Sequence, residues 1–213
     1  MDSFKNTIGL EKDSILSNNL ASIKKYLIFK NHSDTTYIDT SLTIKKFYKF
    51  NFLRNDNLEK LKFSNLGQTY NSLSYNFNNS SLPVFPFTSK QDIYLKSSDV
   101  NYYYVPTPLT ELLFKSVMKQ GQFTDVLFST NTSEKFNFSL GFKGMRSLGN
   151  YQNILSGIKQ FIFTTNYKSK NDKYRIKTHY VSQNLENREN GGLTNASILN
   201  FESEDNLFSE RSK

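Results

Sequence analysis

The chain has 213 residues, a formal net charge of +8 and no cysteine, which excludes a disulfide framework, a thiolate metal site and a cysteine nucleophile. Hydrophobic residues make up only 37% of the chain, whereas aromatic residues reach 15%. Strands with one apolar face and one wet face average to this composition, and so does a soluble all-β protein rich in Tyr and Phe.

The basic residues are scattered along the chain. Only Lys24-Lys25 and Lys45-Lys46 form pairs, and no recognition-helix pattern accompanies them, so we expect no nucleic-acid partner. No run of about 20 apolar residues is present, which excludes a membrane protein built from helices but leaves strands open. The sequence contains no metal cluster, phosphate loop or nucleotide fingerprint, and we expect no cofactor.

An enzyme is also not expected. The two histidines are His32, in a predicted turn, and His179. Ser182 lies near His179, but no acid is placed to orient the imidazole, so a catalytic triad is poorly supported.

The N-terminal half has a weak pattern. Residues 1–20 read as a polar tail, and residues 21–105 as a β-hairpin and loop region. Within it we expect two strands around a turn at 31–34, and a further strand over 41–53. The rings of "NYYYVPTPL" fit an interfacial girdle and loop packing equally well.

From residue 106 to 213 the pattern is regular and predicts an antiparallel up-and-down β-meander. The predicted strands cover residues 109–118, 123–131, 136–147, 161–168 and 173–180. Tight turns at 132–135 and 169–172 fall at one end of this meander, and long loops at 148–157 and 185–197 fall at the other. The turn at 119–122 is the exception, because it is short on the long-loop end.

Loop lengths and strand lengths together favour a transmembrane β-barrel. Outer-membrane barrels have short turns at one end, long loops at the other and strands of about 10 residues. We therefore expect the fold to be all-β, an incomplete segment of an antiparallel up-and-down transmembrane β-barrel. A soluble β-sandwich, in which the aromatic faces pack on each other, is the alternative fold.

Period-two alternation divides the strands into two faces. The predicted lipid-facing set is Phe136, Phe138, Leu140, Phe142, Tyr174, Ile176 and Tyr180. The predicted pore-lining set is Lys143, Arg175, Lys177 and His179, and Asn137 and Ser139 share its face. Lys159 lies in register with Phe161, so both a pore position and an interfacial position with a snorkelling side chain stay open.

Two expectations follow from these faces. No acid is seen on the pore-lining strand faces except near their ends, so an open pore is expected to prefer anions weakly. An arginine at Leu140 is expected to weaken membrane folding, and an arginine at Ser139 is expected to cost little.

Several segments resemble the β-barrel porins of Bacteroidetes, of the flavobacterial type. They include "KFNFLRNDNLEKLKFSNLGQTYNSLSY", "GFKGMRSLGNYQNILS" and "ENRENGGLTN", and the resemblance extends from about residue 34 to the C-terminus. Members of that family begin with a signal peptide and have longer barrels, so we interpret this chain as a fragment of such a protein.

The resemblance implies a protein of the bacterial outer membrane that lets small hydrophilic solutes diffuse passively. Its partners would be outer-membrane lipid and those solutes. Two alternatives stay open: a non-conducting barrel plugged by residues 21–105, with a structural, assembly or secretion role, and a soluble β-sandwich adhesin. The oligomeric state, the strand number and the solute are not predicted.

Overall fold

A computed structural model describes most of the chain beyond residue 20. The described residues are 21–30, 34–39, 43–55, 58–75, 91–117, 121–151, 153–171, 173–189, 191–192, 195 and 198–203. The predicted tail at 1–20, His32 and the turn residues 31–33 lie outside them.

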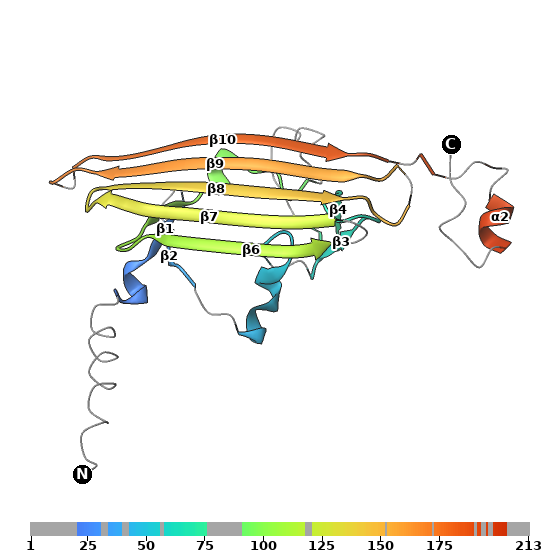
Figure 1. The fold of residues 1–213 in the computed structure, drawn as a ribbon, viewed down its shortest axis with the longest axis horizontal. Coiled ribbons are helices and arrows are strands. Elements are labelled where there is room, and N and C mark those ends of the chain that lie inside the picture. The colour runs from blue at the N-terminus through green and yellow to red at the C-terminus, as the bar shows by residue number, and fades with distance from the viewer. Residues whose placement is uncertain are drawn as a thin grey trace, which may run out of the picture.

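A five-stranded antiparallel sheet dominates the structure (Figure 1). Its strands are β6 (Leu109–Val117), β7 (Gly121–Ser133), β8 (Phe136–Ser147), β9 (Ser156–Lys168) and β10 (Arg175–Asn187). They follow one another across the sheet in the order β10-β9-β8-β7-β6, which is an up-and-down meander. The predicted all-β class and meander are thus confirmed, and within the described residues the sheet is open, with β6 and β10 at its edges.

The register of the sheet gives it two distinct faces. Ser139 on β8 lies opposite Ser129 on β7 and Thr164 on β9, so their side chains share the face that we call the inner face. Leu140, one residue further along β8, lies opposite Phe128 and points to the other side, which we call the outer face. Because the side-chain period is two along all five strands, these faces run across the whole sheet.

The N-terminal segment (residues 21–105) contributes short elements. They are η1 (Ile23–Lys25), β1 (Leu27–Phe29), β2 (Thr35–Tyr37), η2 (Ile44–Phe50), β3 (Lys60–Lys62), β4 (Tyr70–Ser72), η4 (Ser97–Asp99) and β5 (Tyr102–Tyr104). Strand β1 pairs with both β2 and β5, and β3 pairs with β4, all antiparallel. The hairpin of β3 and β4 turns through Gly67, whose φ of 85° favours glycine.

The strand predicted over 41–53 is wrong, because η2, a 3-10 helix, occupies its centre. Ile44, Phe47 and Phe50 recur every third residue, which matches the three-residue turn of a 3-10 helix rather than a strand. Tyr102 and the two tyrosines that follow it form β5. Tyr102 is almost fully buried, so its ring packs inside the protein and does not belong to an interfacial girdle.

The N-terminal segment packs on the inner face of the sheet. Its Phe52 meets Phe123 of β7 edge to face, with ring centroids 5.5 Å apart. The two side chains belong to one buried core that also contains Leu53, Tyr70, Ile93, Met145 and Ile158. In Figure 1, β3 and β4 lie towards the long-loop end of the strands, and β1 and β2 lie towards the other end.

Side-chain amides of the sheet bind backbone groups of the N-terminal segment. Gln160 donates to the carbonyl of Ile93 at 2.7 Å, and Gln183 both donates to and accepts from the backbone of Leu95. Near the short-turn end, Asn131 accepts from the amide of Val105. The polar inner face was expected to line a wet interior, but much of it is buried: Asn137 is 1% exposed and Ser139 2%. Such burial is possible because a side-chain amide or hydroxyl can form hydrogen bonds with protein groups as well as with water.

A short helix, α2 (Ile198–Ser203), follows the sheet. None of the helices among the described residues combines the length and apolar character needed to span a membrane.

Candidate functional site

A cavity of ≈ 540 Å³ lies between the inner face of the sheet and the N-terminal segment. The sheet contributes Glu111, Asp125, Lys143 and Gln160 to its lining, from four successive strands. The facing wall comes from the N-terminal segment and includes Arg54 and Tyr103, together with residues 92–95. The site is concave and polar, and it lies where the N-terminal segment and the sheet are not in direct contact.

Register brings opposite charges together in this cavity. Asp125 on β7 is the direct cross-strand partner of Lys143 on β8, and their charged atoms lie 3.6 Å apart. Glu111 lies on the same face of β6, two residues from Leu113, the residue opposite Asp125. Cross-strand and diagonal neighbours on one face are close enough for their side chains to interact.

Arg54 links the N-terminal segment to these acids. Its guanidinium pairs with Glu111, and its Nε lies 3.6 Å from Asp125 Oδ2. The backbone at Arg54 has a φ of 60°, in the left-handed region that residues with a Cβ rarely adopt. Such a conformation persists only where surrounding contacts hold it, and here two carboxylates bind the side chain.

Tyr103 adds a neutral hydroxyl to the cavity. Burial, together with a smaller effect of the charges of Glu111 and Asp125, raises the pKa of Tyr103 to about 12, although a hydrogen bond with Asn101 acts in the opposite direction. The phenol therefore stays protonated at neutral pH and can donate a hydrogen bond. The cavity thus presents cationic, anionic and neutral polar groups to one space.

The structure separates Lys143 from the other predicted pore-lining residues. Lys177 donates to the carbonyl of Lys30 at 3.2 Å, and its ammonium lies 5.4 Å from the ring centre of Tyr102. Arg175 lies over the Phe29 ring. These contacts hold β10 against β1 and β5, away from the cavity, and the pore-lining role of the whole set stays a prediction.

His179 also contacts the N-terminal segment. Its Nδ1 lies 2.8 Å from the hydroxyl of Tyr102 and its Nε2 lies 3.4 Å from the hydroxyl of Ser97. Ser182 pairs in register with Phe161 on the outer face, whereas His179 pairs with Thr164 on the inner face. The two side chains therefore point to opposite sides of β10 and cannot act together.

The residues predicted to face lipid lie on the outer face. Leu140 is 37% exposed and Phe142 45%, and Tyr180 on the edge strand is 60% exposed. Tyr174 immediately precedes β10 and is 72% exposed. Phe136, Phe138 and Ile176 share this face by register. Contact with lipid stays a prediction.

Sequence reasoning missed Arg54, Glu111 and Asp125. The sequence shows no acid on the strand faces of the pore-lining set away from their ends, but Asp125 on the neighbouring strand β7 lies directly opposite Lys143. A signal was present, since Asp125 falls in phase with Phe123 and Ser129 in "FTDVLFSTN". Pairing it with Lys143 required the register, and placing Arg54 beside it required the tertiary fold.

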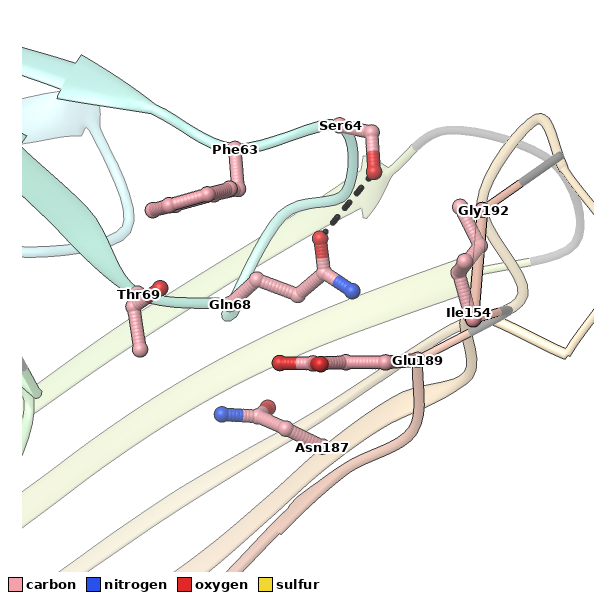
Figure 2. Close-up of a pocket in the computed structure, with 9 residues that line it drawn as sticks. Phe63, Ser64, Gln68, Thr69, Ile154, Asn187, Glu189 and Gly192 are labelled. Atoms are coloured by element: carbon pink, nitrogen blue, oxygen red, sulfur yellow. Dashed lines mark hydrogen bonds between the residues drawn. The ribbon is translucent and has the colours of Figure 1, made fainter. Parts of the chain in front are cut away.

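A second cavity, of ≈ 360 Å³, opens at the long-loop end, between the β3–β4 hairpin and the end of β10. Figure 2 shows Phe63, Thr69 and Gln68 on one side and Asn187 and Glu189 on the other. Gln68 accepts from Ser64 at 3.2 Å and donates to the carbonyl of Arg188 at 3.2 Å. This residue therefore ties the hairpin to the end of β10.

One protein-family model matches almost the whole chain. Residues 22–213 match the model of a family described as "Putative porin". The chain belongs to this porin family. No curated protein and no solved structure matches the chain. Family membership agrees with a channel-type, non-enzymatic protein, and with the general class that the resemblance of its segments implied.

Proposed function

We propose that this porin-family chain forms part of an outer-membrane β-barrel that lets small hydrophilic solutes diffuse passively. The observation that carries the proposal is the two-faced meander, with strands of up to 13 residues, an apolar outer face and a charged cavity on the inner face. Strands of this length and alternation suit a bilayer. The origin in Bacteroidetes and the outer-membrane location remain part of the proposal.

The charged cavity is the proposed route for solutes. Charges of both signs line it, so neither sign dominates. The cations are Lys30, Arg54 and Lys143, and the acids are Asp92, Asp99, Glu111 and Asp125. The expected anion preference assumed a lumen without acids, and these carboxylates remove that premise. We infer instead that the balance between the two signs sets ion selectivity.

Single-channel recording tests this proposal. The intact protein, reconstituted in planar bilayers, should give discrete conductance steps. Under a salt gradient, Asp125→Asn should shift the reversal potential towards anion preference, and Lys143→Gln should shift it towards cation preference, because each change removes one sign of fixed charge. Lys170→Gln, in the β9–β10 turn, is the control and should leave the reversal potential unchanged.

A second candidate is a non-conducting barrel with a structural, assembly or secretion-accessory role. The observation that favours it is the apolar core between the N-terminal segment and the sheet, in which Phe52 and Ile93 pack on Phe123, Met145 and Ile158. An apolar contact of this kind excludes water and ions. Bilayer insertion without any conductance would replace the diffusion proposal with this one.

A further inference from the structure

The outer face of the sheet changes from apolar to basic at its long-loop end. One cross-strand row of this face contains Val126, Phe142 and Phe161. The next outer-face positions towards the loops are Lys159 on β9, which lies opposite Gly144, and Arg146 on β8, which lies opposite Gly157. Two cations therefore stand beside the apolar rows, on neighbouring strands and on the same side of the sheet.

A shallow cavity of ≈ 340 Å³ lies at this position and includes Arg146, Lys159, Glu186 and Arg188 in its lining. Gly157 also lines it, and a Cβ there would lie at an ordinary contact distance of 3.8 Å from the Glu186 side chain. The hollow is thus formed on the backbone of two paired strands, with long basic side chains around it.

The charge of the cavity lining is positive. Arg146, Lys159 and Arg188 carry three positive charges and Glu186 carries one negative charge, which leaves a net charge of two positive. Glu186 pairs with Arg188, whose Nε lies 2.8 Å from its Oε1. In the described part of the chain, neither Arg146 nor Lys159 pairs with an acid, so both are available to an anion.

The position along the strands matches the depth of lipid headgroups. The apolar positions of β8 run from Phe136 to Phe142, which at ~3.3 Å per residue is about 20 Å of strand. At the ~40° tilt of barrel strands this covers about 15 Å of depth, the central part of the ~25 Å apolar band. Lys159 lies two residues before Phe161 in the chain, about 7 Å further towards the loops. Long loops mark the outer side of such barrels, so the basic cavity falls at the outer leaflet.

We propose that Arg146, Lys159 and Arg188 bind a phosphate group of an outer-leaflet lipid; this inference rests on the membrane placement in the proposed function. The guanidinium groups offer paired N–H donors that match phosphate oxygens. The Lys159 stem can lie along the apolar surface near Phe161 while its ammonium reaches the headgroup. The apolar rows beside the cavity would contact the acyl chains of the same lipid.

Binding of a phosphorylated lipid to the intact protein tests the site. The protein is held in a neutral detergent and titrated with a bisphosphorylated glucosamine lipid, and retained lipid is counted by native mass spectrometry. We expect one lipid to be retained with selectivity over its dephosphorylated form. The double variant Arg146→Gln/Lys159→Gln should bind about 30-fold more weakly, a factor of about five for each lost charge.

The matched control is Lys170→Gln/Lys173→Gln, which removes two positive charges at the opposite, short-turn end of β9 and β10. This variant should bind the lipid as the native protein does. Equal binding by both double variants overturns the site. Equal binding of the phosphorylated and dephosphorylated lipids also overturns it, because phosphate is then not recognised.

Vesicle flotation and conductance distinguish a failure of the lipid site from a failure of the proposed function. If the native protein floats with vesicles and conducts, but its lipid binding ignores Arg146 and Lys159, the lipid site fails and the proposed function stands. If the native protein does not enter vesicles, both fail. If millimolar inorganic phosphate displaces the lipid equally well whatever the length of its acyl chains, the site belongs to a free anion. This result would overturn the lipid proposal.

Discussion

At the scale of the residue, Asp125 shows how one carboxylate joins the sheet to the N-terminal segment. It lies between Lys143 of the neighbouring strand and Arg54 of the N-terminal segment. All three side chains are largely withdrawn from solvent, so each charge depends on the others for compensation. The free energy with which such a group interacts with its neighbours is measured by a double-mutant cycle rather than by one substitution.

Replacing Asp125 alone should lower the free energy of unfolding more than replacing Asp125 and Lys143 together. Asp125→Asn leaves two cations close together without their shared partner, and we expect it to lower the free energy of unfolding by about 3–5 kcal/mol. The double variant Asp125→Asn/Lys143→Met should recover part of this loss. Urea unfolding of the vesicle-reconstituted protein measures both, and additive effects would show that the two side chains are not coupled.

Leu140 tests the contact of the outer face with lipid. Leu140→Arg should lower the free energy of folding into vesicles by about 2–4 kcal/mol if the residue meets the bilayer midplane. Ser139 is unsuitable as its control, and the expectation that it tolerates arginine is wrong, because its side chain is buried against Thr164. Ser116→Arg, on the outer face near the rim, should cost only about 0–1 kcal/mol. Equal costs at the two positions would remove the membrane interpretation.

The raised pKa of two tyrosines predicts a loss of stability at high pH. Tyr70 is buried and Tyr103 is half-buried. Burial raises the pKa of Tyr70, and likewise of Tyr103, from 10.0 to about 12. Between pH 10 and 12 the unfolded chain loses these protons and the folded chain keeps them, so stability falls as pH rises, by about 2–3 kcal/mol for each group. Tyrosinate absorbance should show a late phase, which Tyr70→Phe reduces. Titration of all tyrosines in a single early phase would contradict this.

At the scale of the element, Asn65 is one of the side chains that fasten the β3–β4 hairpin to the long-loop end of the sheet. Asn65 donates to the carbonyls of Ser147 and Ile154, at 3.0 and 2.7 Å, and accepts from the hydroxyl of Ser147. It is almost completely buried. Because water cannot replace these bonds, the side chain fixes where the N-terminal segment sits against the sheet.

Asn65→Ala should loosen the N-terminal segment. The change leaves two buried carbonyls without a donor, and we expect docking to weaken by about 2–4 kcal/mol. Limited proteolysis of the folded protein should then cleave residues 21–105 faster and leave the sheet intact. Leu61→Ala, which shortens an exposed side chain of β3 in the same hairpin, should change the cleavage rate little. An unchanged rate in Asn65→Ala would show that other contacts hold the segment.

At the scale of the whole molecule, the segment on the inner face and the aromatic residues on the outer face give the sheet two different environments. The inner face is satisfied by chain from residues 21–105, whereas large apolar side chains such as Phe142 and Tyr180 stay exposed on the outer face. Exposed apolar area of this extent needs a partner. Lipid is the partner that the proposed function supplies.

Extraction tests that environment for the intact protein. We expect it to sediment with membranes after a carbonate wash and to leave them only with detergent, because the described part of the chain leaves apolar side chains of the outer face exposed. Its refolded form should float with vesicles in a density gradient. Recovery in the aqueous phase without detergent would eliminate both barrel candidates and favour the soluble β-sandwich.

The meander and its two faces can be predicted from the amino-acid pattern alone. Strict alternation along residues 136–147 and through the hairpin at 161–180 predicts strands β8 to β10, because a period of two forces successive side chains to opposite sides. Only the tertiary structure decided what covers the inner face. Residues 43–55 have no clear alternation, and their 3-10 helix and the left-handed Arg54 are held by contacts with Asp39, Glu111 and Asp125. The contacts of Arg54 with Glu111 and Asp125 join residues far apart in the chain, which no local pattern encodes, so the charged cavity had to be seen in the fold.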